Sequence, residues 1–406
     1  MDARTGLPVV GMVGGGQLAR MTHQAAIALG QSLRVLVASA DDAAALVTPG
    51  ATIGAHTDLD ALRSFADGCD VVTFDHEHVP TAHIRALEAA GVTVHPSSAA
   101  LLHAQDKLVM RRRLVELDVP VPPFSPVESP ADLYAFADEH GWPCVLKAAR
   151  GGYDGRGVWL LDSPASDEKR ADRDDEKRAE RTVRELLDAG TPLLVEQRVA
   201  MRRELAVLLA RSPFGQGAVW PVVETVQRDG ICVEVLSPAP DLSPATAERA
   251  SELALRIARE LDVVGVLAVE LFCTDDDVLV NELAMRPHNS GHWSIDGSLT
   301  SQFEQHLRAV LDYPLGDTTP LAPAVVMANV LGAQELPAMG VDERLHHLFA
   351  RFPDARVHVY GKAERPGRKL GHVTVLGDDM AEVRERAALA AHWLANARWP
   401  DGYAIH

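Results

Sequence analysis

Residues 281–293 read NELAMRPHNSGHW, a dense polar stretch at the end of two strand-like segments, VGVLAVELF at 264–272 and DVLVNEL at 277–283. Glu270 lies inside the first segment, Glu282 lies near the end of the second, and a turn-prone stretch connects them. Such a hairpin would hold the two carboxylates side by side. Paired carboxylates suit Mg²⁺, which takes one or two of them and completes its shell with substrate phosphates. The alternative is a buried strand pair whose two acids lie at its rim.

Two residues that follow the hairpin extend this hypothesis. Arg286 and Asn289 would stand just beyond the metal, where a small anion needs a cation and an amide. One acid in an apolar run is usually a rim residue. Two acids followed by RPHNSGHW favour a functional site.

Composition and charge limit the classes of function. A chain of 406 residues with 47% hydrophobic residues is long enough for two or three domains with their own cores. No apolar run approaches the ~20 residues of a membrane span, and the N-terminus lacks the pattern of a secretory signal. Four dispersed cysteines without a CxxC pair indicate reduced thiols and a cytoplasmic location. A net charge of −18 argues against nucleic-acid binding.

The segment order predicts an α/β beginning. Residues 7–39 alternate strand-like, helix-like and strand-like runs, and CDVVTFDHE and VTVHPS read as later strands. Residues 103–117 predict one basic amphipathic helix, which ends before the proline-rich boundary at 120–130. The almost wholly charged residues 167–181 predict a solvated helix or a mobile excursion, with partner binding as the alternative.

Residues 14–19, GGGQLA, fit the G-x-G-x-x-A dinucleotide fingerprint between a strand and a helix. The acid expected at the end of the second strand is missing, because Ser39 stands there. A glycine-rich turn at a helix N-terminus can bind any phosphate. We therefore expect a phosphate-binding turn without a specified ligand.

Residues 150–157, RGGYDGRG, contain four glycines in eight positions between strand-like runs. The exposed N–H groups of such a loop can fold over phosphates. Lys147 precedes the loop in an apolar strand, where a lysine is unfavourable unless an anion pairs with it. The alternative is a hairpin with a surface lysine. VEQRV at 195–199, followed by Glu204, is a weaker signal for adenine and ribose contacts.

Residues 365–372, RPGRKLGH, concentrate positive charge in an acidic chain, with Lys362 just before them. We expect this loop to reach back to the turn at 14–18, where guanidinium groups and backbone N–H donors could bind a phosphate between them. The alternative is a solvated basic loop.

Together these motifs resemble the ATP-grasp superfamily and, more narrowly, the N5-carboxyaminoimidazole ribonucleotide synthetase family. The resemblance spans nearly the whole chain. It rests on GGGQLARM at 14–21, GGYDGRG at 151–157, VEQ at 195–197, NELAMRPHNSGHW at 281–293 and RPGRKLGH at 365–372.

The resemblance implies a mixed α/β and α+β fold of three parts. These are a Rossmann-like N-terminal domain at 1–103, an ATP-grasp domain at 104–316 with a lid subdomain at about 123–195, and a small C-terminal domain at 317–406. It implies carboxylation of 5-aminoimidazole ribonucleotide with ATP and bicarbonate. It also implies Mg²⁺ but no biotin, small-molecule substrates only, and a cytoplasmic homodimer that binds neither nucleic acid nor membrane.

The family also implies roles for individual residues. Those expected at ATP are Lys107, Lys147, Gly152, Tyr153, Asp154, Gly155, Arg156, Gly157, Val158, Glu196, Gln197, Arg198, Val199, Glu204, Gln227, Asn281 and Glu282. Glu270 and Glu282 are expected to hold Mg²⁺. The catalytic set is Tyr153, Asp154, Arg156, Arg286, His288 and Asn289. The acceptor set is Gly16, Gln17, Leu18, Glu77, Lys362, Arg365, Arg368 and Lys369.

Three alternatives stay open at this point. A sister ATP-grasp ligase would keep the nucleotide site and change the acceptor. An NAD-dependent oxidoreductase would rest on residues 14–19 alone and would bind nicotinamide but not ADP. A non-catalytic regulator would bind ATP without turnover stimulated by bicarbonate.

Overall fold

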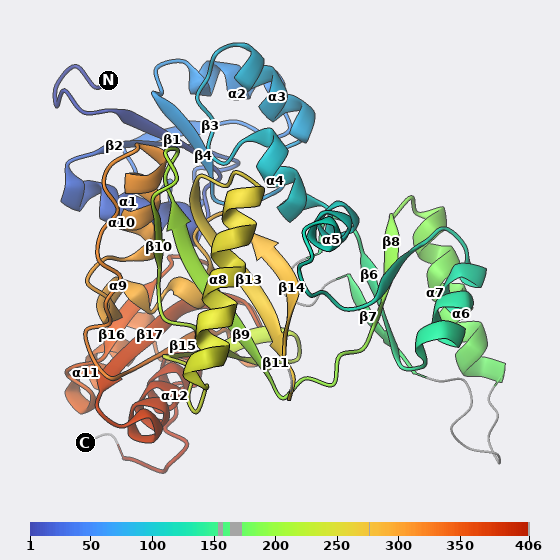
Figure 1. The fold of residues 1–406 in the computed structure, drawn as a ribbon. Coiled ribbons are helices and arrows are strands. Elements are labelled where there is room, and N and C mark those ends of the chain that lie inside the picture. Colours follow the sequence, from blue (N-terminus) through green and yellow to red (C-terminus); the bar gives the residue numbers. More distant parts are fainter. Residues whose placement is uncertain (153–156, 163–172, 276, 405–406) are drawn as a thin grey trace.

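The computed structural model describes residues 1–152, 157–162, 173–275 and 277–404. It is a mixed α/β structure with three β-sheets, which confirms the predicted fold class. Figure 1 shows a main body with a smaller lobe standing to one side of it. Within the described ranges, no helix combines the length and the apolar character needed to cross a membrane.

The N-terminal region is a four-stranded parallel sheet in the order β3-β2-β1-β4. Its strands are β1 (Val9–Val13), β2 (Ser32–Val37), β3 (Gly50–Ile53) and β4 (Val71–Phe74), and its helices are α1 (Gln17–Leu29), α2 (Leu59–Ala66) and α3 (Thr81–Ala89). All five residues of β1 are buried, as expected of the central strand of a covered parallel sheet. The strand expected in VTVHPS is reduced to a single bridge between Val72 and Val94.

The single helix predicted at 103–117 is wrong. The structure has two helices, α4 (Ser98–Gln105) and α5 (Lys107–Glu116), separated at Asp106. Asp106 has an extended backbone, and its carboxylate accepts hydrogen bonds of 3.0 Å from the N–H groups of Leu108 and Val109. An aspartate in this N-cap position starts a new helix because it satisfies otherwise unpaired N–H groups.

The smaller lobe is an antiparallel sheet in the order β5-β8-β6-β7, covered by two helices (Figure 1). Its elements are β5 (Phe124–Val127), α6 (Pro130–His140), β6 (Cys144–Ala148), β7 (Val158–Leu161), α7 (Arg173–Asp188) and β8 (Leu193–Gln197). Ala179 and Val183 of α7 are buried in the core of the lobe. The C-terminal part of the charged run, residues 173–181, is therefore in a helix, and residues 167–172 lie outside the described ranges.

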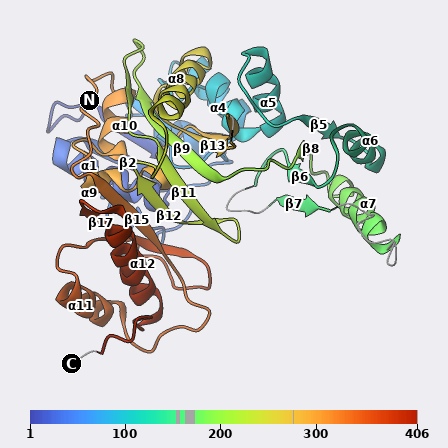
Figure 2. The ribbon, with the colours of Figure 1, turned by 60° about the horizontal axis from the view of Figure 1, so that its bottom comes forward.

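The main body is built on a nine-stranded antiparallel sheet in the order β14-β13-β9-β11-β12-β15-β17-β16, with β10 beside β9. The strands are β9 (Arg203–Arg211), β10 (Gly217–Val219), β11 (Val223–Arg228), β12 (Ile231–Ser237), β13 (Gly265–Cys273), β14 (Val278–Ala284), β15 (Ala324–Leu331), β16 (Arg356–Val359) and β17 (Lys369–Gly377). Because β12 pairs with β15, the C-terminal strands continue the central sheet without interruption (Figure 2).

Helices α8 (Pro244–Glu260), α9 (Ser294–Gly297), α10 (Gln302–Val310), α11 (Val341–Arg351) and α12 (Met380–Asn396) pack on this sheet, and a short 3₁₀ turn, η1 (Asn289–Gly291), follows β14. Helix α10 also joins the body to the N-terminal sheet, since buried His306 contacts both. The His306 Nε2 atom lies 2.8 Å from the Thr73 hydroxyl, and Nδ1 accepts a 3.1 Å bond from the Val266 N–H. This joint fixes the two parts that border the cleft described next.

Candidate functional site

A cleft of about 1500 Å³ lies where the N-terminal region, the lobe, the central hairpin and the C-terminal region meet. Its walls include the turn at 14–18, the end of β8, the β13–β14 hairpin and the loop at 362–369. Segments that are more than three hundred residues apart in sequence therefore border one space.

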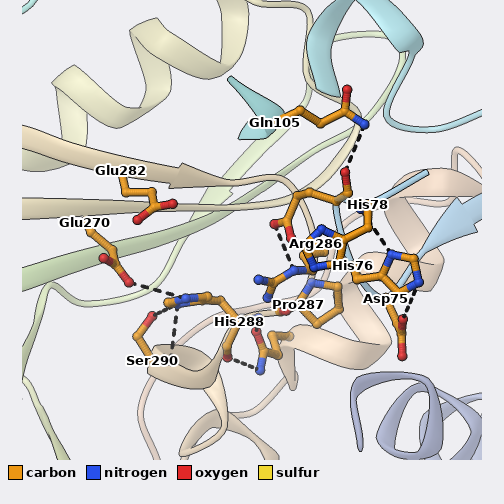
Figure 3. A network of polar contacts seen from close by, with 12 residues as sticks. Asp75, His76, His78, Gln105, Glu270, Glu282, Arg286, Pro287, His288 and Ser290 are labelled. Carbon is orange, nitrogen blue, oxygen red and sulfur yellow. Dashed lines mark hydrogen bonds and ion pairs between the residues drawn. The ribbon is translucent and has the colours of Figure 1, made fainter. Parts of the chain in front are cut away.

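The hairpin places its two acids as predicted from the sequence. Glu270 of β13 pairs in register with Glu282 of β14 (Figure 3). A bulge follows and leaves Asn281 as the extra residue. Burial, and then the nearby charge of Glu282, raise the pKa of Glu270 to about 8. A divalent cation between the two carboxylates would offset both the cost of burying the charge of Glu270 and its repulsion by Glu282.

The donor set fits Mg²⁺, which uses few protein oxygens and takes others from phosphate and water. Among the described residues, no group of three or more His, Cys, Asp or Glu side chains is arranged to hold a metal. A cation at Glu270 and Glu282 would therefore need further oxygen ligands from a substrate.

The two lysines expected at phosphate have carboxylate partners in the chain itself. Lys107 Nζ lies 2.5 Å from Glu282 Oε1, and Lys147 Nζ lies 2.6 Å from Glu196 Oε2 and 3.2 Å from Asn281 Oδ1. Glu196 thus supplies the anion that a lysine in an apolar strand needs, and the contact of Lys147 with phosphate stays a prediction. Phosphate oxygens at these lysines would compete with or join these pairs.

Arg111 does not line the cleft, but it contacts two residues that do, and the sequence analysis missed it. It is fully buried, its Nε donates to Glu196 Oε1 at 2.7 Å, and its second nitrogen donates to the Asn281 carbonyl at 2.8 Å. Burial opposes ionisation of Glu196, but the charges of Lys147 and Arg111 outweigh it and lower the pKa of this carboxyl. Arg111 lies four positions after Lys107 on α5, so the two side chains lie on one face of the helix. This spacing is the sequence signal that could have identified Arg111.

Arg286 and His288, which follow the hairpin, point to two different walls of the cleft, the N-terminal region and the carboxylate pair (Figure 3). Arg286 Nε lies 2.8 Å from Glu77 Oε1, across the boundary with the N-terminal region. His288 Nε2 lies 3.3 Å from Glu270 Oε1, and its Nδ1 lies 2.9 Å from the Ser290 hydroxyl. The motif therefore connects the carboxylate pair to the N-terminal wall.

The glycine turn at 14–18 contacts a buried acid, Asp75 at the end of β4, that the sequence analysis did not identify. The Gly16 N–H donates to Asp75 Oδ2 at 2.6 Å, so one N–H expected at a phosphate is already bound. Gly14 has φ +122°, and a Cβ on it would lie 1.6 Å from Asp75 Oδ1, so only glycine fits there. Burial raises the pKa of Asp75 to about 6.

The C-terminal basic loop meets this turn, as expected from the sequence. Lys362 Nζ donates to Gln17 Oε1 across the cleft. Arg365, Arg368 and Lys369 also line the cleft.

Most residues predicted for the site line this one cleft. They are Gly16, Gln17, Leu18, Glu77, Lys107, Lys147, Gly152, Val158, Glu196, Gln197, Arg198, Val199, Glu204, Gln227, Glu270, Asn281, Glu282, Arg286, His288, Asn289, Lys362, Arg365, Arg368 and Lys369. Gly157 is not among the residues that line the cleft; it lies just before β7, beside β6, where its carbonyl accepts a 2.8 Å bond from the Ala148 N–H. Tyr153, Asp154, Gly155 and Arg156 lie outside the described residues.

Comparisons with known domain families match three consecutive stretches of the chain. Residues 7–105 match the ribonucleotide synthetase preATP-grasp domain, residues 112–303 match the ATP-grasp domain, and residues 325–386 match the phosphoribosylaminoimidazole carboxylase C-terminal domain.

Similar proteins cover nearly the full length. N5-carboxyaminoimidazole ribonucleotide synthase of Mycobacterium tuberculosis is 63% identical over 400 residues, which cover 98% of this chain and 90% of that protein. The enzyme of the same name from Corynebacterium ammoniagenes is 49% identical over 408 residues, covering 98% and 94%. A crystal structure of the Aspergillus clavatus N5-carboxyaminoimidazole synthase with ADP and 5-aminoimidazole ribonucleotide has 30% identity and a TM-score of 0.83, and the match covers 96% of this chain and 98% of that one. This chain therefore belongs to the N5-carboxyaminoimidazole ribonucleotide synthase family of ATP-grasp proteins.

Proposed function

We propose that this protein is an ATP-grasp ligase that carboxylates 5-aminoimidazole ribonucleotide in purine biosynthesis. It uses ATP and bicarbonate and releases N5-carboxyaminoimidazole ribonucleotide, ADP and phosphate. The observation that supports this most strongly is the division of the cleft into two charged ends. The carboxylate pair with Lys107 and Lys147 forms one end, and the basic loop at 362–369 meets the N-terminal turn at the other.

The nucleotide would occupy the end between the lobe and the hairpin. Lys107 and Lys147 face the space beside Glu282 and Asn281, where they can neutralise phosphate oxygens. Residues 197–199 at the end of β8 line the same end, and their backbone groups can border the adenine. When bound at Glu270 and Glu282, Mg²⁺ would supply positive charge to the phosphate oxygens.

Bicarbonate is a poor electrophile because its carbon carries an electron-rich carboxylate. Transfer of the γ-phosphoryl group to a bicarbonate oxygen breaks the β–γ bridge of ATP, releases ADP and creates a good leaving group. The protein contributes mainly by positioning and by neutralising charge. Arg286, His288 and Asn289 line the cleft between the two ends, where they can bind the bicarbonate anion.

The acceptor amine then attacks the activated carbon, the bond from carbon to the phosphate oxygen breaks, and the nitrogen loses a proton. The ribonucleotide phosphate would lie at Lys362, Arg365, Arg368 and Lys369, which leaves the imidazole facing the carboxylate pair. Closing the cleft around these groups would protect the activated carbonate from water. We also expect a cytoplasmic homodimer.

Release of ADP in mixtures that each lack one component tests this proposal. Rapid release should require ATP, Mg²⁺, bicarbonate and 5-aminoimidazole ribonucleotide together. Turnover that is independent of bicarbonate would indicate a sister ATP-grasp ligase. Turnover supported by another amine or carboxylate acceptor instead would indicate the same.

A further inference from the structure

Gln302, the first residue of α10, is fully buried behind the motif that contains His288. Its side-chain amide makes a bidentate contact with the backbone of that residue. The His288 N–H donates to Gln302 Oε1 at 2.8 Å, and Gln302 Nε2 donates to the His288 carbonyl at 2.8 Å. The second Nε2 proton is placed to donate to His292 Nδ1 at 2.9 Å.

These partners fix the orientation of the amide. Only Oε1 can accept from the His288 N–H, and only Nε2 can donate to the His288 carbonyl, so a flipped amide would place like groups together. Neighbouring contacts tighten the arrangement. The Gln302 N–H donates to the Ser294 hydroxyl at 2.9 Å, and that hydroxyl donates to the Gly291 carbonyl at 2.6 Å.

The backbone of residues 286–291 is packed directly against this amide. A Cβ on Gly291 would lie 2.5 Å from Gln302 Oε1, so only a glycine allows this approach. His288 lies between β14 and η1 and is the N-cap residue of η1. Its N–H is bound by the Gln302 side chain, and its carbonyl accepts from Gln302 Nε2 and, at 3.0 Å, from the Gly291 N–H. Gln302 therefore supplies the partner of the His288 N–H and one of the two partners of its carbonyl.

We propose that Gln302 is a positioning residue for the anion-binding part of the cleft. By holding the His288 backbone, it sets the directions of Arg286, His288 and Asn289, whose side chains enter the cleft. Gln302 touches no substrate in this proposal. The inference rests on the proposed function, because it assumes that these three residues bind bicarbonate.

The same helix contains a matched control. Gln305 is also fully buried and makes the same bidentate contact with a backbone, that of Gly316. Gln305 Nε2 donates to the Gly316 carbonyl at 2.9 Å, and the Gly316 N–H donates to Gln305 Oε1 at 2.7 Å. Neither Gln305 nor Gly316 is among the described residues that line the cleft. A substitution at either glutamine thus removes the same pair of bonds to a backbone, and Gln302 loses its bond to His292 as well. Only Gln302 holds a residue that lines the cleft.

The test compares Gln302→Met with Gln305→Met, since methionine keeps the length of the side chain and removes its hydrogen bonds. Both variants should lose similar thermal stability. Gln302→Met should raise the KM for bicarbonate about tenfold and lower kcat, because misplaced binding groups lose much of their effect. Its KM for ATP should stay within about twofold of the wild type, as should all constants of Gln305→Met, since hydrogen bonds remote from the substrates do not position them.

If Gln302→Met does not fold, Gln302→Glu and Gln305→Glu replace the pair. A glutamate at position 302 still accepts from the His288 N–H but cannot make both of the bonds that Gln302 Nε2 donates, so the same selective rise in the KM for bicarbonate is expected. An unchanged KM for bicarbonate in a folded Gln302 variant overturns the proposal. An equal rise for all substrates also overturns it, because that result indicates general damage. Wild-type turnover without any bicarbonate requirement would instead refute the proposed function.

Discussion

Replacing Asp75 by asparagine should remove a pH-dependent destabilisation of the folded protein. Asp75 is buried beside the glycine turn, with His76, Glu77, Arg286 and Lys362 as its charged or titratable neighbours. Burial is the main cause of its raised pKa, and the hydrogen bond from the Gly16 N–H opposes the rise. Asparagine can still accept that bond through its side-chain carbonyl.

The magnitude follows from the two pKa values. The pKa of Asp75 is about 6 in the folded protein and has an ordinary value of 3.8, so the folded state holds this proton more tightly. The tighter binding of this proton contributes fully to the free energy of unfolding below pH 3.8, and the contribution is lost as the pH rises through 6. Because one pKa unit corresponds to about 1.36 kcal/mol, the full loss is about 3 kcal/mol, of which about 1.4 kcal/mol falls between pH 5 and pH 8.

Urea unfolding of the wild type and Asp75→Asn at pH 5, 6, 7 and 8 measures this effect. The free energy of unfolding of the variant, relative to the wild type, should rise by about 1.4 kcal/mol across the series. Asp42→Asn is the control, because the Asp42 carboxylate accepts bonds from the N–H groups of Ala38 and Ser39 near the same turn. A gain of the same size in Asp42→Asn would show that the effect does not come from Asp75. A difference between wild type and Asp75→Asn that is constant with pH would refute the reasoning.

Three further predictions concern the ends of the cleft. Glu270→Gln and Glu282→Gln should each reduce turnover about a hundredfold or more at modest Mg²⁺, because each removes an anionic ligand at constant volume. Thermal unfolding should be unchanged in both variants. Near-normal activity of either variant would contradict the metal assignment. Lys147→Ala should weaken ATP binding in calorimetry by about tenfold or more and leave acceptor binding nearly unchanged, because a charge-assisted contact with phosphate is lost. The double variant Arg368→Ala with Lys369→Ala should raise the KM for aminoimidazole ribonucleotide about tenfold or more at unchanged KM for ATP; equal effects on both substrates would place the acceptor phosphate elsewhere.

The fold class and the hairpin could be predicted because their signals are local. Two apolar runs joined by a turn-prone stretch predicted β13 and β14 as a hairpin, and the hairpin predicted that Glu270 and Glu282 lie side by side, as their register confirms. The meeting of the basic loop with the N-terminal turn was expected from charge alone, and the contact between Lys362 and Gln17 agrees with it.

The remaining features depend on tertiary partners that sequence patterns do not specify. Arg111 reads as one of three arginines on a basic helix, and only the packing of α5 against β8 and β14 selects it for burial against Glu196. Asp75 reads as a loop acid at the end of β4, and its burial results from the close approach of Gly14. The helix break at Asp106 was missed because helical periodicity continues across it, whereas the N-cap hydrogen bonds decide the boundary.

In the proposed reaction, the carbon of bicarbonate ends on the amine of the acceptor at the expense of ATP. Incubation with ¹³C-labelled bicarbonate, ATP, Mg²⁺ and 5-aminoimidazole ribonucleotide, followed by carbon NMR and ADP quantification, tests it directly. We predict a new carbamate carbon signal that grows in a one-to-one ratio with ADP and is absent without the ribonucleotide. Formation of ADP while the label remains entirely in the bicarbonate pool would contradict the account.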